Sequence, residues 1–209
     1  MLEIRGYATP NSVKVVIAAE ELDLPYKLVP VDLRRGEQRS DAFKSLNPNG
    51  KVPVLIDHSP AAGGDVVLSE SAAIMVYLAE KENRLLPTEP VGRSKVFEQL
   101  FFHASGLSPA FLQAFLIGMQ KEPIAEAKEA ALKEVDRVLA VLDGKLGLQP
   151  YAAGDEYTIA DIAHFGWIWR HTMIGAQLDK FEFVRIWHDQ IISRPAVVRA
   201  IANTMALAE

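Results

Sequence analysis

Apolar positions change their spacing part-way along the chain. Up to about residue 82, short strand-like apolar runs alternate with segments whose apolar residues recur every three or four positions, as on one face of a helix. This predicts the order β-α-β-α-β-β-α, with elements at 2–5, 12–22, 27–31, 41–46, 52–57, 66–69 and 70–82. Beyond position 91 only helical spacing occurs, which predicts helices at 96–119, 124–146, 159–174, 184–192 and 196–207. The sequence therefore predicts an α/β domain over 1–83, a linker over 84–90 and an all-α domain over 91–209.

The turn and proline positions refine the predicted sheet. The first two strands are separated by a helix and should run parallel, whereas Gly63, Gly64 and Asp65 predict a turn that makes the last two strands an antiparallel hairpin. Pro53 lies near the start of the third strand, where an ordinary trans proline is tolerated. In this element order, however, the proline resembles that of the thioredoxin fold. The resemblance predicts a cis Val52–Pro53 bond that leaves the backbone of Val52 to pair with an extended peptide.

Charge and composition narrow the classes of partner. The formal net charge is -5, so the chain lacks the excess of Lys and Arg that nucleic acids or anionic membranes require. No apolar run reaches the roughly 18 residues of a membrane span, and the first residues do not resemble a signal peptide, so we expect a cytoplasmic protein. The chain has no cysteine. Disulfides, thiolate metal sites and a thiol nucleophile belonging to the protein itself are therefore excluded.

Ser69, Glu70 and Ser71 precede a predicted helix. One of the two serines is expected to cap it, with Glu70 near the positive end of the helix dipole. The same residues also suit an α-amino acid group, whose carboxylate would bind the Ser71 hydroxyl and the first helix amides while its ammonium group binds Glu70. Combined with Val52 and Pro53, they predict a site for a peptide that begins with such a group.

Thr9, Pro10 and Asn11 precede the first predicted helix. On their own they indicate a turn followed by an N-cap at Asn11 or Ser12. The Thr9 hydroxyl and the Asn11 amide are also hydrogen-bond donors at a helix N-terminus, where free amides and the dipole favour an anion. Such donors would lower the pKa of a bound thiol from its usual value of about 8.5. Because the protein has no thiol of its own, that thiol would come from a ligand.

Two further patterns predict structure rather than chemistry. Thr158 and Asp161 have the spacing of a capping box, and we expect Asp161→Ala to cost on the order of 1 kcal/mol or more of stability. The histidines lack the spacing of a metal site and are expected at surface or interface positions, with no metal bound. They are His58, His103, His164, His171 and His188.

Several motifs together resemble the cytosolic glutathione transferases over essentially the whole chain: 47–55, 70–74 with 77–78, Gly154, and 158–161. Within that superfamily, 9–11, 31–33 with Gly36 and Gln38, and 57–64 resemble the bacterial nu class of disulfide-bond reductases acting through glutathione. The resemblance implies a thioredoxin-like domain, a helical domain and a glutathione-dependent enzyme, either a transferase or a disulfide reductase, with glutathione as co-substrate. Its second substrate would be a small electrophile or disulfide. The alternative is a glutathione-binding scaffold with little turnover.

The resemblance also implies roles for individual residues. Thr9 and Asn11 would stabilise the glutathione thiolate, with Tyr7 as a further candidate. The residues implied to bind glutathione are Gln38 and Lys51 at the glycine end, Val52 with Pro53 at the cysteinyl backbone, and Glu70 with Ser71 at the γ-glutamyl end. Lys51 would suit a solvated surface position equally well. A homodimer is implied too, because the family's site is completed across a two-fold axis.

The helical half departs from the nu-class pattern. Leu112 and Gln113 stand where that pattern carries Gly-Gln, and Ala130 stands where it carries a basic residue. The polar groups that would hold two glutathiones or oxidised glutathione are therefore incomplete. Phe111, Phe115 and Met119 have the helical spacing typical of a core, and the alternative is an apolar acceptor site.

Overall fold

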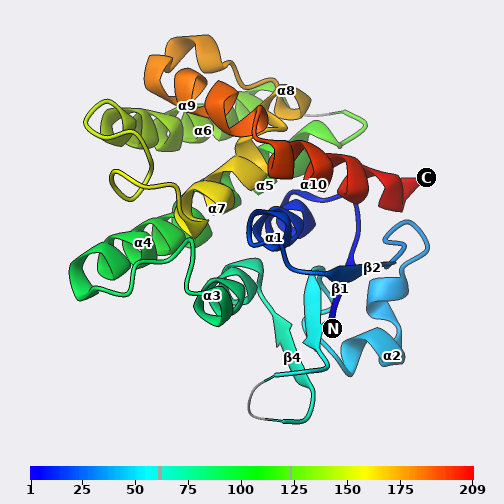
Figure 1. The fold of residues 1–209 in the computed structure, drawn as a ribbon. Coiled ribbons are helices and arrows are strands. Elements are labelled where there is room, and N and C mark those ends of the chain that lie inside the picture. The colour runs from blue at the N-terminus through cyan, green and yellow to red at the C-terminus, as the bar shows by residue number, and fades with distance from the viewer. Residues whose placement is uncertain (61–62, 123) are drawn as a thin grey trace. The chain divides into compact units, whose positions relative to one another are not determined.

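The computed structural model describes residues 1–60, 63–122 and 124–209. The chain forms two compact units (Figure 1). The first contains residues 1–84 together with 193–209, and the second contains residues 85–192. Residues 193–209 therefore pack with the sheet, although the domain boundaries predicted from the sequence placed them in the all-α domain over 91–209.

A four-stranded sheet is the centre of the first unit. Its strands are β1 (Leu2–Gly6), β2 (Tyr26–Pro30), β3 (Val54–Asp57) and β4 (Val66–Ser69), in the order β2-β1-β3-β4. β1 and β2 are parallel, whereas β3 is antiparallel to both β1 and β4. The predicted parallel pair and antiparallel hairpin are confirmed. Residues 61 and 62 of the stretch that joins β3 to β4 lie outside the described residues.

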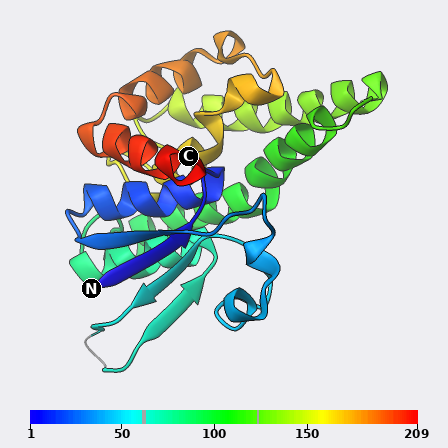
Figure 2. The same ribbon diagram turned by 90° about the vertical axis from the view of Figure 1, so that its right-hand side faces the viewer.

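Helices cover both faces of this sheet. They are α1 (Pro10–Glu21), η1 (Glu37–Arg39), α2 (Asp41–Lys44), α3 (Ser71–Glu82), α10 (Pro195–Met205) and η4 (Ala206–Ala208). α1 and α3 lie on one face and α2 on the other, and α10 runs along the side of α1 that faces away from the sheet (Figures 1 and 2). Covered from two sides, α1 is buried continuously from Ser12 to Ala19. It is therefore an interior helix rather than an amphipathic surface helix.

The second unit is helical. Its elements are α4 (Pro90–Phe102), η2 (His103–Leu107), α5 (Ser108–Gly118), α6 (Ala125–Leu146), α7 (Ile159–Ile168), α8 (His171–Ile174), η3 (Leu178–Lys180) and α9 (Glu182–Ile192). The sequence predicted one helix over 96–119, but its middle is the π-helical segment η2, which lies just before Pro109. Proline cannot donate the usual backbone hydrogen bond, and a π-helical turn is one way a helix accommodates that loss.

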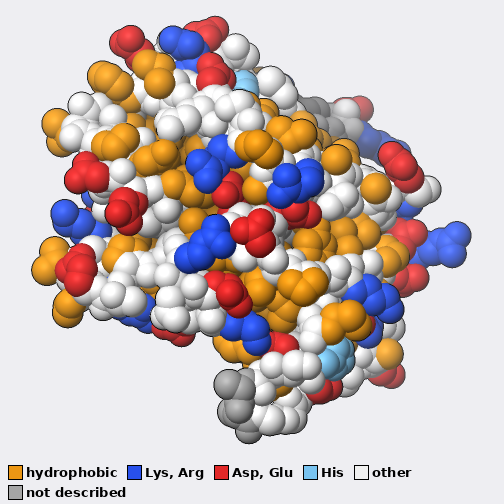
Figure 3. All heavy atoms as spheres, in the orientation of Figure 1, with side chains coloured by type: hydrophobic (Ala, Val, Ile, Leu, Met, Phe, Trp, Pro, Cys, Tyr) orange, Lys and Arg blue, Asp and Glu red, His pale blue; other side chains and the backbone are white. Residues whose placement is uncertain are grey.

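The continuous stretch Pro90–Gly118 is 29 residues long and has a mean hydropathy of 1.4 in its most apolar window. By length and composition alone it would pass as a membrane span, contrary to the sequence prediction. Core helices of water-soluble proteins pass the same test, and 33% of the window is buried inside the protein. On the face seen in Figure 3, acidic and basic side chains are interspersed, in keeping with the small net charge of -5.

The predicted capping box begins α7, and it does more than cap. Asp161 is fully buried and accepts hydrogen bonds from the backbone N–H of Thr158 at 2.9 Å and of Ala152 at 2.8 Å. It also accepts from the Trp187 indole at 2.9 Å and the Thr158 hydroxyl at 3.2 Å. Burial raises the pKa of Asp161, and these hydrogen bonds oppose that shift. The carboxylate therefore joins α7, α9 and the loop before α7.

The histidines were predicted to lie at surface or interface positions, and for three of them this prediction is wrong. His103, His164 and His188 are buried, with side chains against other rings of the helical unit. The reason is that an imidazole ring of intermediate polarity can pack against other rings inside a helical core. Among the described residues, no three metal-binding side chains lie together.

Candidate functional site

Strand register brings the predicted site residues to one end of the sheet. Arg5 at the end of β1 pairs with Val54 at the start of β3, and Val54 pairs with Ser69 at the end of β4. The three segments just beyond these pairs are therefore neighbours: 7–11 after β1, 51–53 before β3, and 70–71 after β4. β2 ends at the same edge because Gly6 pairs with Pro30, and the chain from there leads to Gln38.

Thr9 is the N-cap of α1. Its hydroxyl accepts a hydrogen bond from the Ser12 N–H at 3.1 Å and bonds to the Ser12 hydroxyl at 3.0 Å. The Ser12 hydroxyl also accepts from the Tyr7 N–H at 3.2 Å. The sequence predicted Asn11 or Ser12 as N-cap, which is wrong, because the helix begins at Pro10, two residues before the predicted start at Ser12. Gly6 permits this packing, since a Cβ there would lie 3.1 Å from the Ser12 Oγ.

Asn11 is half-buried in the first turn of α1, and its side chain is held by a lysine that the sequence analysis did not single out. The Nζ of Lys14 donates to the Asn11 Oδ1 at 2.8 Å. Lys14 is only 1% exposed. Burial lowers its pKa to about 7, and the negative charge of Glu70 opposes that shift. One charged residue inside the apolar run Val13–Ile17 was the signal in the sequence.

The Val52–Pro53 bond is cis, which confirms the prediction. Among the described residues, the backbone of Val52 forms no hydrogen bond with other backbone groups. The loop that precedes it is fixed by the buried Asn47, whose amide donates to the Lys51 carbonyl at 2.6 Å. This loop therefore presents an unpaired N–H and C=O beside the ends of β1 and β4, whereas the Lys51 side chain is exposed.

Gln38 lies against the same loop. A Cβ added to Gly50 would lie 3.0 Å from the Gln38 carbonyl oxygen, so a glycine is needed for this approach, and its φ of +63° also suits glycine. The Oε1 atom of Gln38 is buried without a hydrogen-bond partner in the part of the chain that the structure describes. A buried amide oxygen without a partner is unfavourable, so Gln38 has an acceptor to offer a ligand.

α3 begins without a side-chain cap. Its N-cap residue is Glu70, and among the described residues no side chain accepts from its first amides, so the predicted capping by Ser69 or Ser71 is wrong. Glu70 has a φ of +71° and a ψ of 110°, a sparsely populated conformation for a residue with a side chain. Such backbone strain is found preferentially at binding sites. The amides at the start of α3 and the exposed Glu70 carboxylate thus lie together.

The apolar residues considered as an acceptor site differ in their exposure. Phe111 is buried in the helical unit with its ring centroid 6.3 Å from that of Trp167, as the core interpretation predicts. Phe115 is half-buried, whereas Met119 is 69% exposed.

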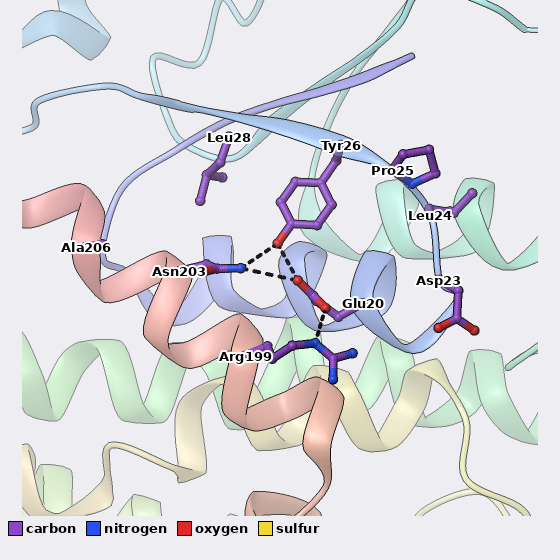
Figure 4. Close-up of a pocket in the computed structure, with 9 residues that line it drawn as sticks. All are labelled: Glu20, Asp23, Leu24, Pro25, Tyr26, Leu28, Arg199, Asn203 and Ala206. Carbon is purple, nitrogen blue, oxygen red and sulfur yellow. Dashed lines mark hydrogen bonds and ion pairs between the residues drawn. The ribbon is translucent and has the colours of Figure 1, made fainter.

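A hollow of about 660 Å³ lies elsewhere on the first unit, where α10 meets α1 and β2 (Figure 4). The Glu20 carboxylate at its centre accepts from Tyr26 at 2.7 Å, from Arg199 at 2.7 Å and from Asn203 at 3.2 Å. Burial and the bond to Glu20 raise the pKa of Tyr26 to about 12. These polar groups bind one another, so we interpret the cluster as an attachment of α10 to the sheet unit rather than as a reaction site.

Two family descriptions match the sequence. The model of "Glutathione S-transferase, N-terminal domain" matches residues 8–81, and that of "Glutathione S-transferase, C-terminal domain" matches residues 105–195. Disulfide-bond oxidoreductase YfcG of Escherichia coli (strain K12) is 36% identical over 203 residues, covering 96% of this chain and 94% of the relative. Glutathione S-transferase 1 of Schizosaccharomyces pombe is 37% identical over 206 residues, covering 90% of this chain and 89% of the relative.

Solved structures with the same fold hold glutathione. A glutathione transferase family member from Pseudomonas fluorescens pf-5, with two glutathione bound, has a TM-score of 0.90 at 33% identity and is covered to 92%, with 96% of this chain aligned. A glutathione transferase from Pseudomonas putida, with one glutathione disulfide bound per subunit, has a TM-score of 0.89 at 32% identity. The match covers 96% of this chain and 90% of the P. putida chain. These similarities confirm the predicted fold class of a thioredoxin-like α/β domain and a helical domain.

Proposed function

Because the chain belongs to the glutathione S-transferase family, we propose that it is a glutathione-dependent enzyme whose bound glutathione thiolate reduces disulfides or attacks electrophiles. The observation that carries the proposal is the set of groups at one end of the sheet. Within the described part of the chain, they are the unpaired backbone of Val52, the uncapped start of α3 beside Glu70, the buried Gln38 acceptor, and the Asn11 amide at the start of α1. A tripeptide with a central thiol offers a chemical partner to each.

Glutathione would bind as an extended peptide. Its γ-glutamyl carboxylate would accept from the Ser71 hydroxyl and the first amides of α3, and its ammonium group would pair with Glu70. The cysteinyl N–H and C=O would pair with the backbone of Val52, as a strand pairs with a sheet edge. At the glycine end, the Lys51 ammonium would attract the carboxylate and Gln38 would accept from an amide.

Thr9 and Asn11 would then face the sulfur. The Asn11 amide nitrogen is a donor, and its oxygen is already occupied by Lys14. In the structure the Thr9 hydroxyl donates to the Ser12 Oγ at 3.0 Å. Either hydroxyl of such a pair can donate, so with a thiolate bound Ser12 would donate to Thr9 and the Thr9 proton would be directed to the sulfur. Two donors at the positive end of α1 favour thiolate over thiol. Each unit by which they lower the thiol pKa corresponds to about 1.4 kcal/mol of stronger binding of the thiolate than of the thiol. No general base on the protein is needed, because the thiol proton passes to water.

In the disulfide reaction, the glutathione thiolate attacks one sulfur of the substrate disulfide. A mixed disulfide forms while the other substrate sulfur leaves as a thiolate and takes a proton from water. A second glutathione thiolate then attacks the glutathione sulfur of the mixed disulfide. This releases the second substrate thiolate and yields oxidised glutathione, so two glutathiones are oxidised for each disulfide reduced. With an electrophile, the same thiolate forms a thioether and displaces a leaving group.

We further propose that disulfide reduction is the main activity, with the second glutathione arriving from solution. A relative at 36% identity is named a disulfide-bond oxidoreductase, which supports the reaction type. Leu112 and Ala130 have apolar side chains, so neither supplies a polar group to a second tripeptide. We also propose a cytoplasmic homodimer, and the strongly exposed apolar residues Val91 and Phe101 of α4 support an interface there.

Steady-state kinetics with reduced glutathione tests the function. Hydroxyethyl disulfide is expected to be turned over, with a chlorinated aryl compound as the electrophile for comparison. Asn11→Ala should lower kcat for disulfide exchange about tenfold or more while the Kd for glutathione changes less than about threefold, because the lost donor acts on the sulfur. Equal losses in the two constants would mean that Asn11 only helps to hold the ligand. Glutathione binding without turnover of either substrate would favour the scaffold.

A further inference from the structure

A lysine lies buried directly behind the proposed thiolate site. Lys14 belongs to the interior helix α1, is 1% exposed, and has apolar neighbours in sequence on both sides. Burying an ammonium group is costly, and an apolar side chain of similar length would fill the same space more favourably. Nothing in the proposed binding of glutathione uses Lys14 directly. Its position therefore calls for a functional explanation.

The hydrogen bond from Lys14 determines which way the Asn11 amide faces. An ammonium group can only donate, so the Asn11 atom 2.8 Å from Nζ must be the carbonyl oxygen. The two donors on Asn11 Nδ2 then point elsewhere and are available to an acceptor. Without Lys14, the amide could turn over and present its oxygen to the sulfur, which would repel a thiolate.

A charged residue on another element acts on Lys14. Glu70, at the start of α3, raises the Lys14 pKa and so opposes the effect of burial. Two cations in and just before α10 are engaged near the other end of α1, where Arg194 binds Glu21 at 2.6 Å and Arg199 binds Glu20 at 2.7 Å.

The cation on the neighbouring strand β1 is also engaged in an ion pair, since Arg5 binds Glu3 at 2.7 Å. Lys14 lies three positions from Asn11, the proposed thiolate donor, and its ammonium group donates a hydrogen bond to it. A negative sulfur in front of Asn11 would favour the charged form of Lys14, so the two groups would titrate as a coupled pair.

We propose that Lys14 is a positioning residue: its ammonium group holds Asn11 with the amide donors facing the glutathione sulfur and supplies positive charge behind them. This inference rests on the proposed function, in which Asn11 donates to the thiolate. It assigns to one buried side chain both the orientation of the amide and part of the electrostatic stabilisation of the anion.

Two substitutions separate the parts of this role. Lys14→Met removes both the donor and the charge, whereas Lys14→Gln keeps an amide donor for Asn11 Oδ1 without the charge. Lys14→Met should lower kcat for disulfide exchange about tenfold and raise the pKa of bound glutathione, followed by thiolate absorbance near 240 nm, by about one unit. Lys14→Gln should keep part of the rate. Lys133→Met, which removes an exposed lysine paired with Glu129 on α6, is the control and should behave as wild type.

A double-mutant cycle shows whether Lys14 acts through Asn11. In the Asn11→Ala background, Lys14→Met should reduce kcat less than about threefold, because its target is already missing. Full additivity, or a bound-thiol pKa in Lys14→Met equal to that of wild type, would overturn the inference. A wild-type protein that turns over neither substrate would overturn the proposed function instead, and this role with it. Thermal unfolding of every variant shows that each is folded, and Lys14→Gln provides the second test if Lys14→Met is not.

Discussion

Replacing Lys14 with Met should make the protein more stable at neutral and acidic pH. The folded protein holds the Lys14 ammonium in a fully buried position, and burial lowers its pKa from 10.5 to about 7. A difference of this size corresponds to a cost of up to about 5 kcal/mol for keeping the group charged in the fold. Methionine has a similar length and no charge, so it avoids that cost. Because the variant also loses the hydrogen bond to Asn11 Oδ1, the gain in the free energy of unfolding at pH 6 should be this value less about 1–3 kcal/mol.

The gain should depend on pH in a defined direction. The unfolded chain keeps the Lys14 proton up to about pH 10.5, whereas the folded protein releases it above about pH 7. The cost is therefore complete below pH 7, falls between pH 7 and 10.5, and disappears above that range. The difference in unfolding free energy between Lys14→Met and wild type should therefore shrink by about 3 kcal/mol between pH 6 and pH 9.

Urea unfolding at pH 6, 7.5 and 9 measures this difference. Far-UV circular dichroism is the suitable signal, because the three tryptophans, at positions 167, 169 and 187, all lie in the helical unit and would not report on α1. Lys133→Met serves as the control for loss of one positive charge and should change stability by less than about 0.5 kcal/mol at each pH. A Lys14→Met variant that is less stable than wild type at pH 6, or a difference that is the same at all three pH values, would refute the reasoning. Together with the expected loss of activity, greater stability would show that Lys14 is kept for function.

Two further substitutions test carboxylates that hold the fold. Asp161→Ala should lower the free energy of unfolding by about 3 kcal/mol or more, because it leaves the buried donors of Thr158, Ala152 and Trp187 without an acceptor; a loss near 1 kcal/mol in urea unfolding would reduce its role to the helix cap. Asp57 is buried, which raises its pKa, but hydrogen bonds from Lys81 and Tyr77 lower it to about 2 overall. Asp57 therefore contributes about 2 kcal/mol above pH 4 that is lost as the pH falls towards 2, and Asp57→Asn should flatten this part of the stability curve measured by acid titration.

Much of the fold followed from residue spacing. The alternation of strand and helix signals up to residue 82 predicted the sheet unit. The cis bond at Val52–Pro53, which is present, was predicted from the resemblance to the thioredoxin fold, because the residues alone would allow an ordinary trans proline. The long helix over 96–119 was predicted without its π-helical break, since the consequence of Pro109 depends on how the neighbouring turns pack. The same holds for the buried histidines, whose ring contacts come from other helices.

The candidate site was predicted less completely. Its residues could be named from motifs, but the cap of α1 at Thr9 and the uncapped start of α3 depend on where each helix begins in space. Lys14 was not singled out, because a lysine in an apolar run does not show by sequence alone whether its amine reaches the surface.

The sequence by itself determined the order of elements, the absence of a thiol from the protein, and the motifs that indicate glutathione. Local spacing carries the order of elements, and the resemblance of the motifs to those of glutathione transferases carries the indication of glutathione. Only the tertiary structure decided that three separate loops meet at one end of the sheet, because strand register joins Arg5, Val54 and Ser69. It also decided that Lys14 is buried against Asn11, since burial depends on α10 and the sheet enclosing α1 from both sides.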